Sequence, residues 1–536
     1  MTTNPQDYDF VIVGGGSAGA VVATRLVEDI DNRVLVLEAG PENTSYWSRV
    51  PLGFAKILFN PKFMWLDWKT QPDESLGGTV YGLPHGKLLG GSSAINGLVH
   101  VRGNPGDYDA WENAGATGWN YAALLPYFKK SEHDSRGETE FHGGSGPFKV
   151  EPARWKNPLA DAFIDAASRV LGIPRNDDFN RNIIEGAGYW DLATWNGRRT
   201  STDVAYLKPA RKKTNVAVNT EATVTRIHFD GRRATGVSYR KNGQVYRISA
   251  RRDVVLAAGA LHTPQLLQVS GVGPGDLLQR HGIRVVHDLP GVGENLMDHV
   301  QYGAKFRTTS PHTFNKKVGN WFTQGIEGVK YYLLPRNGPL NIGASLAGAF
   351  FRTDPSLSEP NIQLHFLPFM PGDKGWDLAK FSGFRLGMYQ GRPHSRGYAR
   401  ITSPSVDDQP DLVFNHLSHE EDVAAAMAGM RAAMKIAAAM PADLEIEQIA
   451  PKQNPSDDEL LQYIKKTSDT AFHFAGTARM GTDDMAVVDP TTMRVRGVEG
   501  LRVVDASVLP GELTANIHPA VIATAERAAD LIKGSR

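Results

Sequence analysis

The sequence contains no cysteine among its 536 residues. This absence excludes disulfides, thiolate metal sites, iron–sulfur clusters and every mechanism that depends on a thiol. An excess of basic charge is missing too, because 58 Lys and Arg residues balance 58 Asp and Glu residues. A formal charge of zero gives no electrostatic reason to bind nucleic acid, so we expect no nucleic-acid partner.

Long apolar runs are also absent. No uncharged apolar run approaches the ~18 to 20 residues that span a bilayer, and residues 1–6 are polar and lack the apolar core of an export signal. We therefore expect a cytoplasmic protein without a transmembrane segment. The composition, 41% hydrophobic and 22% charged, is typical of a globular chain, and the length leaves room for two or three structural units.

A glycine-rich turn lies near the N-terminus. Residues 9–13 form a β-branched run that predicts a strand, residues 14–19 read Gly-Gly-Gly-Ser-Ala-Gly, and the Ala/Val/Leu-rich stretch to residue 27 predicts a helix. A second apolar run, residues 33–37, ends on Glu38, 19 residues beyond the last glycine. Strand, turn, helix, strand and acid therefore follow one another in the order that a dinucleotide site requires.

Each part of this motif has a physical role in holding a dinucleotide. Small residues let the chain turn tightly, let the backbone approach a pyrophosphate and let the helix pack on the strand; these residues are Gly14, Gly16, Ser17, Ala18 and Gly19. We expect Glu38 to accept a hydrogen bond from an adenosine ribose hydroxyl.

The rest of the chain divides into a sheet-rich part and a second unit. From residue 215, short alternating segments separated by Asp-Gly and Asn-Gly turns predict a β-meander, after which a buried strand from residue 253 returns to the nucleotide domain. Residues 313–467 lack a glycine fingerprint and include an alternating stretch at 362–366. Within them we predict a helix over 418–440, started by a capping box of Ser418 and Glu421 and stopped by Pro441. A closing helix is predicted over 519–533.

Four further motifs follow the dinucleotide fingerprint. They are the glycine-rich loop at 86–96, the segment at 259–273, the His-Phe-Ala-Gly-Thr run at 473–477 and the Asn-Ile-His-Pro run at 516–519. In this order and spacing the set resembles the glucose-methanol-choline (GMC) oxidoreductase family over essentially the whole chain. The likeness is to bacterial choline-dehydrogenase-like alcohol dehydrogenases.

The resemblance implies an FAD enzyme that oxidises a primary alcohol to the aldehyde, by hydride transfer from the alcohol carbon to flavin N5. His473 matches the first catalytic histidine of the family, and His518 matches a second position where members carry histidine or asparagine. Imidazole suits this task because its ordinary pKa near ~6.5 lets it take a proton close to neutral pH. We expect structural roles for His85, His262 and His299.

The resemblance also implies contacts with the cofactor that are mainly made by backbone. The implied residues are Gly86, Gly91, Ala94, Ile95, Asn96, Gly97 and Val99 beside the flavin, Val224 against adenine, Asp505 and Ala506 near the ribityl chain, and Pro519. Members with a covalent flavin can carry a histidine where this chain has Ile95, so we expect FAD to be noncovalent. No metal site is expected.

The implied fold is α/β, or α+β overall: an FAD-binding Rossmann-like domain and a discontinuous substrate-binding domain built on an antiparallel sheet and helices. We assign residues 1–155, 196–312 and 468–536 to the first and residues 156–195 and 313–467 to the second.

Several alternatives stay open. A hydroxynitrile lyase would use the same histidines without redox chemistry, and an oxidase would differ from a dehydrogenase only in whether oxygen, a quinone or a dye reoxidises the flavin. A nicotinamide reductase with two nucleotide sites is disfavoured, because residues 271–275 lack the context of a second fingerprint. We favour an uncharged primary alcohol over choline, since no carboxylate can be placed over the flavin from the sequence. The aromatics that line the pocket or pack the core are Trp65, Trp68, Phe366 and Phe369.

Overall fold

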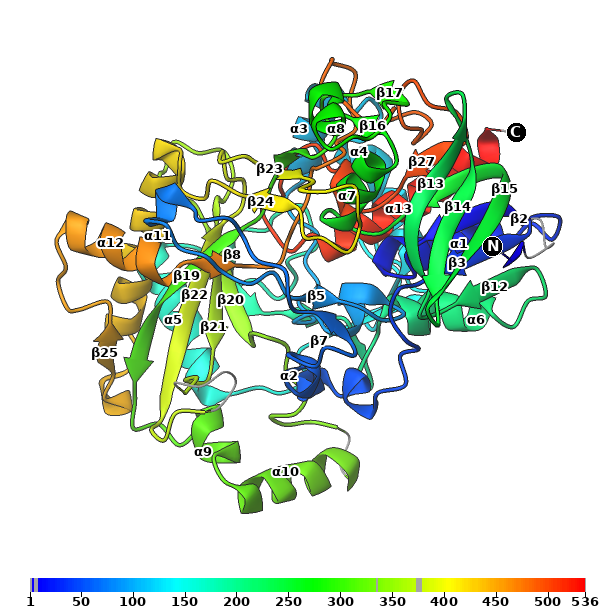
Figure 1. Ribbon diagram of the computed structural model, residues 1–536. Helices are drawn as coiled ribbons and strands as arrows, with labels where there is room; N and C mark the ends of the chain where they lie inside the picture. Colours follow the sequence, from blue (N-terminus) through cyan, green and yellow to red (C-terminus); the bar gives the residue numbers. More distant parts are fainter. Residues whose placement is uncertain (1, 4–7, 334–335, 373–377, 536) are drawn as a thin grey trace.

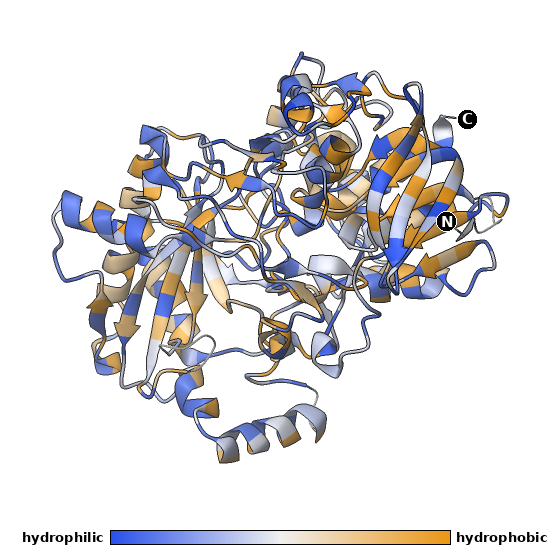
Figure 2. Cartoon of the chain, viewed as in Figure 1, coloured by the Kyte–Doolittle hydropathy of each residue, from blue (hydrophilic) through white to orange (hydrophobic). Residues whose placement is uncertain are grey.

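Two β-sheets organise the computed structural model, which describes the chain except residues 1, 4–7, 334–335, 373–377 and 536. An eight-stranded sheet and a seven-stranded sheet lie at opposite sides of the view in Figure 1, with loops and short elements between them. Apolar residues line the strands of both sheets in Figure 2. Among the described residues, no helix is long and apolar enough to cross a membrane.

The parallel part of the eight-stranded sheet carries the N-terminal fingerprint. Its strands run in the order β12 (Val216–Asn219), β3 (Val34–Leu37), β2 (Tyr8–Val13), β15 (Gln244–Leu256) and β27 (Leu501–Val503). The two-residue β1 (Thr2–Thr3) also pairs with β15. Helix α1 (Ser17–Leu26) packs against α13 (His518–Gly534), which also contacts α4 (Tyr121–Ser131). This arrangement confirms the predicted strand, turn, helix and strand, and the predicted closing helix.

An antiparallel meander is continuous with these strands. It consists of β13 (Thr223–Asp230), β14 (Arg233–Lys241) and the first part of β15. The structure differs from the predicted meander at both ends. Residues 216–218 belong to β12, which pairs with β3 in the parallel sheet, and the strand expected from residue 253 is the second half of β15. A single 13-residue strand thus serves both arrangements, because its first half pairs with β14 and its second half with β2.

The second sheet is antiparallel. Its strands run in the order β25 (Glu447–Ala450), β19 (Val300–Arg307), β22 (Gly383–Gln390), β21 (Ile362–Leu367), β20 (Ala347–Phe351) and β8 (Gly186–Tyr189), and β26 (Asp469–Thr470) pairs with β19. Helices α5 (Pro158–Leu171) and α11 (Glu420–Ala438) pack on each other and on strands of this sheet. Helix α12 (Asp457–Thr467) packs against α11.

The pairing of β19 affects the assignment of residues to the substrate-binding domain. The segment 196–312, which the sequence assigns to the FAD-binding domain, contains β19, and β19 pairs with β22 and β25 in the antiparallel sheet. We therefore propose the two-domain division of the sequence analysis with β19 counted on the substrate side.

The start of α11 differs from its prediction. The helix runs over Glu420–Ala438, inside the predicted 418–440, and its N-cap is His419, whose side chain accepts a hydrogen bond from the Glu421 amide. Ser418 does not cap the helix. Its hydroxyl hydrogen-bonds the Ser395 hydroxyl instead. The helix ends three residues before Pro441, as a proline at that position requires.

Shorter elements connect the sheets. The other α-helices are α2 (Phe54–Ile57), α3 (Pro105–Asn113), α6 (Lys208–Ala210), α7 (His262–Val269), α8 (Gly275–Arg280), α9 (Phe314–Val318) and α10 (Trp321–Leu333). The other strands are β4 (Met64–Trp65), β5 (His85–Gly86), β6 (Glu132–Asp134), β7 (Phe148–Pro152), β9 (Asp191–Leu192), β10 (Thr194–Trp195), β11 (Arg198–Arg199), β16 (Val272–Gly273), β17 (His287–Asp288), β18 (Glu294–Leu296), β23 (Gly397–Arg400) and β24 (Asp411–Val413).

Candidate active site

Four parallel strands end at one edge of the eight-stranded sheet. Val13 of β2 lies in register with Leu37 of β3 and with Leu256 of β15, and Leu256 is in turn paired with Val503 of β27. The loops that follow these strands therefore meet at the carboxyl edge, which is where open α/β sheets bind their ligands. Among the predicted site residues, this edge brings together the 14–19 turn, Glu38, Asp505 and Ala506.

The glycine turn has the shape that a dinucleotide requires. Gly14 has φ +104°, and a Cβ there would overlap the Ala257 carbonyl oxygen; a Cβ on Gly19 would overlap the Gly14 carbonyl oxygen. Helix α1 starts after Gly16 with no side-chain cap and no acidic residue in its first turn. Its first amide groups therefore lack a side-chain cap and can face a pyrophosphate.

Glu38 is buried directly behind this turn. Its two carboxylate oxygens accept hydrogen bonds from the Gly15 and Gly40 amides, each at 2.8 Å. Burial raises the pKa of Glu38, and the two amide donors oppose that rise. The predicted contact with a ribose hydroxyl stays a prediction. The same carboxylate also fixes the backbone of the turn, a role that the sequence analysis does not include.

The second glycine loop lies against the first. The Gly90 amide donates to the Gly15 carbonyl at 2.8 Å, and a Cβ on Gly86 would overlap the backbone of Gly91. The predicted flavin-contacting residues of this loop therefore lie beside the 14–19 turn. Ala94 and Ile95 are buried in a small apolar cluster, and a bridge pairs Val99 with Leu192.

Arg199 supports this loop and was missed by the sequence analysis. The residue is 4% exposed, and its guanidinium donates to the side chain and the carbonyl oxygen of Asn96, each at 2.7 Å. Burial lowers the pKa of Arg199 to about 9, because the charged form is poorly solvated there. A buried cation therefore lies directly beneath the predicted flavin loop.

Asp505 joins the C-terminal segment to the 259–273 segment. Its carboxylate accepts from the Gly259 amide at 2.9 Å and from the Thr263 hydroxyl at 2.6 Å. The next residue, Ala506, accepts from the Gly476 amide at 3.1 Å, which ties the His473 loop to the same edge. Of the other predicted cofactor residues, Val224 is buried on β13, Gly97 accepts from the Ala344 amide at 2.9 Å, and Pro519 lies in the first turn of α13.

His473 is fixed from one side by His299. Their Nδ1 atoms are 2.7 Å apart, and His299 Nε2 lies 2.7 Å from the Gly391 carbonyl oxygen and 2.8 Å from the Leu513 carbonyl oxygen. A carbonyl oxygen can only accept, so His299 Nε2 carries a proton and the Nδ1 of the neutral ring accepts. His473 must then donate from Nδ1, which leaves its Nε2 as an unprotonated base.

A chain of amides meets that base. Asn516 Nδ2 lies 3.2 Å from His473 Nε2, and Asn516 Oδ1 accepts from Gln363 Nε2 at 3.3 Å. The Tyr389 hydroxyl donates to Gln363 Oε1. The hydrogen bonds therefore run from Tyr389 to Gln363, from Gln363 to Asn516 and from Asn516 to His473. The Asn516 amide is the group that donates to His473 Nε2.

Burial keeps the groups around His473 uncharged near neutral pH. It lowers the pKa of His473 well below the ordinary value, with a further lowering from His299 and His365, and it lowers the pKa of His299 to about 4. It raises the pKa of Asp298 to about 8 and that of Glu512 well above its ordinary value. Each shift disfavours the charged form, as expected where water is excluded.

His518 is the first residue of α13, two residues after Asn516. Its Nε2 is buried and has no hydrogen-bond partner among the described residues. Burial lowers its pKa to about 3, with further lowering from His100 and Arg199. No hydrogen bond joins His473 to His518 in the described part of the chain. Asn516 is the link between them, because it contacts His473 and precedes His518 by two residues.

The loop that carries His299, for which a structural role was expected, also holds the His473 segment. Asp298 Oδ1 accepts from the His473 amide at 2.7 Å, and backbone pairing of Met297 with Ala475 aligns the two segments. His299 therefore orients the candidate base directly. The signal available in the sequence was a pair of polar residues, Asp298 and His299, next to the buried strand 300–307.

Other missed residues follow the alternation of β21. Gln363 and His365 lie on one face of this strand. Phe366 lies on the other face and stacks on Phe163 in the core, with ring centroids 4.9 Å apart. Core packing therefore accounts for Phe366, one of the four aromatics considered as pocket residues. The imidazoles of His85 and His262 hydrogen-bond each other at 2.9 Å beside Trp65 and Trp68, which accounts for their expected structural role.

Comparisons with known proteins agree with this geometry. The chain matches the family models of the GMC oxidoreductase N-terminal part over residues 8–301 and C-terminal part over residues 393–525. It is 39% identical to the oxygen-dependent choline dehydrogenase of Staphylococcus aureus strain MSSA476, over 100% of this chain and 95% of that protein.

Solved structures resemble the whole fold. Pyridoxine 4-oxidase from Mesorbium loti superposes with a TM-score of 0.88 at 30% identity, covering 99% of this chain and 100% of that one. The R554A variant of Aspergillus oryzae RIB40 formate oxidase gives a TM-score of 0.90 at 26% identity, covering 100% of this chain and 99% of that one.

The fold and these comparisons therefore define an FAD-dependent oxidoreductase that acts on CH–OH donors. The chain belongs to the GMC oxidoreductase family. Its residues fit FAD, because Gly14 and Gly19 have no room for a Cβ and the α1 N-terminus lacks a side-chain cap.

Replacing Glu38 by Ala should weaken FAD retention by roughly 1.5 to 3 kcal/mol, because the acceptor of two backbone amides, which is also the predicted acceptor of a ribose hydroxyl, is lost. The measurement is the fraction of protein that keeps FAD after dilution and gel filtration. Glu42→Ala is the matched control, since Glu42 is a nearby acid whose carboxylate pairs with Arg211. Unchanged retention in Glu38→Ala would show that this acid does not help to hold the cofactor.

Proposed function

We propose that this protein oxidises an uncharged primary alcohol to the aldehyde, with His473 as the base and His518 as a second hydrogen-bond partner of the alcohol oxygen. The observation that carries the proposal is the hydrogen-bond order around His473, which leaves Nε2 without a proton. FAD, when bound, supplies the acceptor for the hydride that leaves the alcohol carbon.

The base is prepared before substrate arrives. His299 holds the Nδ1 proton of His473 in a hydrogen bond, so the ring cannot switch to the tautomer that protonates Nε2 without losing that bond. Asp298 fixes the backbone at the same residue. An alcohol hydroxyl that replaces the Asn516 amide would donate its proton to Nε2.

His518 is assigned the second role because its buried Nε2 lacks a partner within the described residues. An unsatisfied buried nitrogen costs free energy unless a ligand meets it. Together with His473 it would hold one oxygen from two directions, which fixes the distance of the alcohol carbon from the hydride acceptor.

Replacing His473 by Ala should lower the rate of flavin reduction by an alcohol by about 10²- to 10⁴-fold, the usual contribution of general-base catalysis, while FAD stays bound. Anaerobic stopped-flow absorbance measures this rate. His518→Asn should be milder, since asparagine can still hydrogen-bond the oxygen. The double alanine variant should lose less than the product of the single losses, because both groups act on one transition state.

The pH profile provides the control for that result. The rate should rise with pH as His473 loses its proton, and the rise should be complete below the ordinary pKa near ~6.5, since burial lowers this pKa. His473→Ala should remove the dependence. Flavin reduction at a near wild-type rate in His473→Ala would contradict the assignment.

The cofactor should be noncovalent, because the buried Ile95 offers no atom for a bond to the flavin. Acid precipitation should therefore release all FAD, and an alcohol should bleach the flavin without NAD or NADP. A hydroxynitrile lyase would instead cleave a cyanohydrin while no alcohol bleached the flavin. Flavin that stays on the denatured chain would refute the noncovalent assignment, and stoichiometric peroxide in air would identify an oxidase.

Choline is the second candidate substrate, favoured by the choline dehydrogenase relatives and by one observation. Glu512 is buried, its carboxyl oxygens have no hydrogen-bond partner among the described residues, and it lies 3.9 Å from His299 Nδ1. This carboxyl could pair with a quaternary ammonium. Its raised pKa keeps it neutral without such a cation, which is the reason for preferring an uncharged alcohol.

A substrate panel with Glu512→Gln separates the two candidates. If the substrate is uncharged, primary aliphatic or aryl alcohols should give the highest kcat/KM, and Glu512→Gln should change it by less than about threefold, as expected when a neutral acid is replaced by a neutral amide. If choline is the best substrate and Glu512→Gln raises its KM at least tenfold, the preference stated here is wrong.

A further inference from the structure

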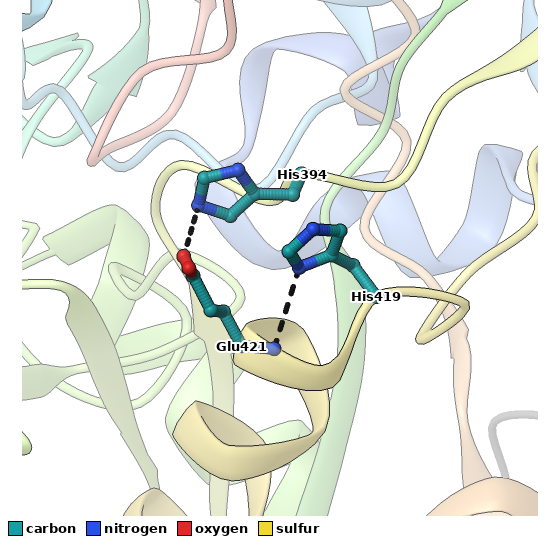
Figure 3. Close-up of side chains that lie close together, drawn as sticks. All are labelled: His394, His419 and Glu421. Atoms are coloured by element: carbon teal, nitrogen blue, oxygen red, sulfur yellow. Dashed lines mark hydrogen bonds and ion pairs between the residues drawn. The ribbon is translucent and has the colours of Figure 1, made fainter.

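Two histidines and a glutamate gather on the surface where the segment between β22 and β23 meets the start of α11. His394 Nε2 lies 2.8 Å from a carboxylate oxygen of Glu421, and the rings of His394 and His419 are stacked with centroids 4.8 Å apart (Figure 3). One nitrogen or oxygen from each of the three lies within 4.8 Å of the others, and all three residues are exposed.

The backbone beneath these side chains is fixed by Asp422. The residue is 1% exposed, and its carboxylate accepts from the His394 amide at 2.8 Å, the Ser395 amide at 2.9 Å and the Ser395 hydroxyl at 2.6 Å. The Ser418 amide donates to the same hydroxyl at 3.2 Å. Both segments are therefore pinned to each other before any ligand arrives, which lowers the entropy cost of binding.

We propose that His394, His419 and Glu421 bind one divalent transition-metal ion, of which Zn²⁺ is the probe that best matches the donors. Two imidazole nitrogens and one carboxylate oxygen are a usual Zn²⁺ ligand set, with water at the fourth position. His419 would lose little hydrogen bonding on binding the metal, because its Nδ1 accepts only a long hydrogen bond, 3.4 Å, from the Glu421 amide.

The local charge favours a cation. The positive end of a helix dipole opposes one, but the first turn of α11 carries Glu420, Glu421 and Asp422. In the described part of the chain, no lysine or arginine forms an ion pair with Glu421. The second cluster of this type, Glu132, Asp134 and His142, differs because Arg102 and Arg136 already pair with its carboxylates.

The test is calorimetric titration of Zn²⁺ into the FAD-loaded, full-length protein, free of a histidine tag and treated with chelator. Wild-type protein should bind one equivalent at this site. Glu421→Gln and His394→Ala should each weaken that binding at least about tenfold, since loss of a ligand should cost no less than loss of its outer-shell partners. Glu420→Gln is the matched control, because it removes the same charge from the same helical turn without removing a ligand.

Two further results decide the outcome. Zn²⁺ should raise the unfolding temperature of wild-type protein and of Glu420→Gln, but not of Glu421→Gln. Equal melting temperatures of all variants in chelator show that each still folds. The proposal fails if no saturable equivalent binds, if Glu421→Gln binds as tightly as Glu420→Gln, or if His394→Ala keeps wild-type affinity. In those cases His394 and Glu421 form only an exposed ion pair.

Discussion

The contact between His299 and His473 is the constraint on which the catalytic arrangement depends. Two backbone carbonyl oxygens, from Gly391 and Leu513, accept from His299 Nε2 and so decide which nitrogen of each ring carries a proton. The protein thereby sets the tautomer of its base with main-chain atoms, which do not titrate. Burial removes the remaining freedom, because it keeps both rings neutral near pH 7.

The fold makes this contact possible by bringing four distant segments together. Residues 297–301 pair along their backbone with 469–475, which sets His299 beside His473, while Gly391 follows β22 and Leu513 precedes α13. The base therefore lies where the antiparallel sheet meets the C-terminal segment of the nucleotide-binding part. Asp505 and Ala506 anchor that segment at the carboxyl edge of the parallel sheet, so the cofactor loops and the base share one framework.

The sequence predicts the parts of the site that are local. The 14–19 turn, Glu38 and the closing helix follow from spacing and from the need for small residues, and each is found where it was expected. Asp298, Gln363 and Arg199 were missed, and the contact of His299 with His473 was not foreseen, because these roles arise from contacts across more than one hundred residues. Contacts between distant residues also explain two wrong predictions. Strand β12 pairs with β3 in the parallel sheet and not with the meander, and Ser418 does not cap α11 because its hydroxyl hydrogen-bonds the Ser395 hydroxyl.

The protonation of His473 can be observed directly by ¹⁵N NMR of the histidine-labelled, FAD-loaded protein near pH 7, with the His473 signals assigned by substitution. The account predicts a proton on Nδ1 and a bare Nε2, and it predicts that replacing His299 by Ala allows the other tautomer to appear. A proton on Nε2 of His473 in the wild-type protein, or a doubly protonated ring, would contradict the account.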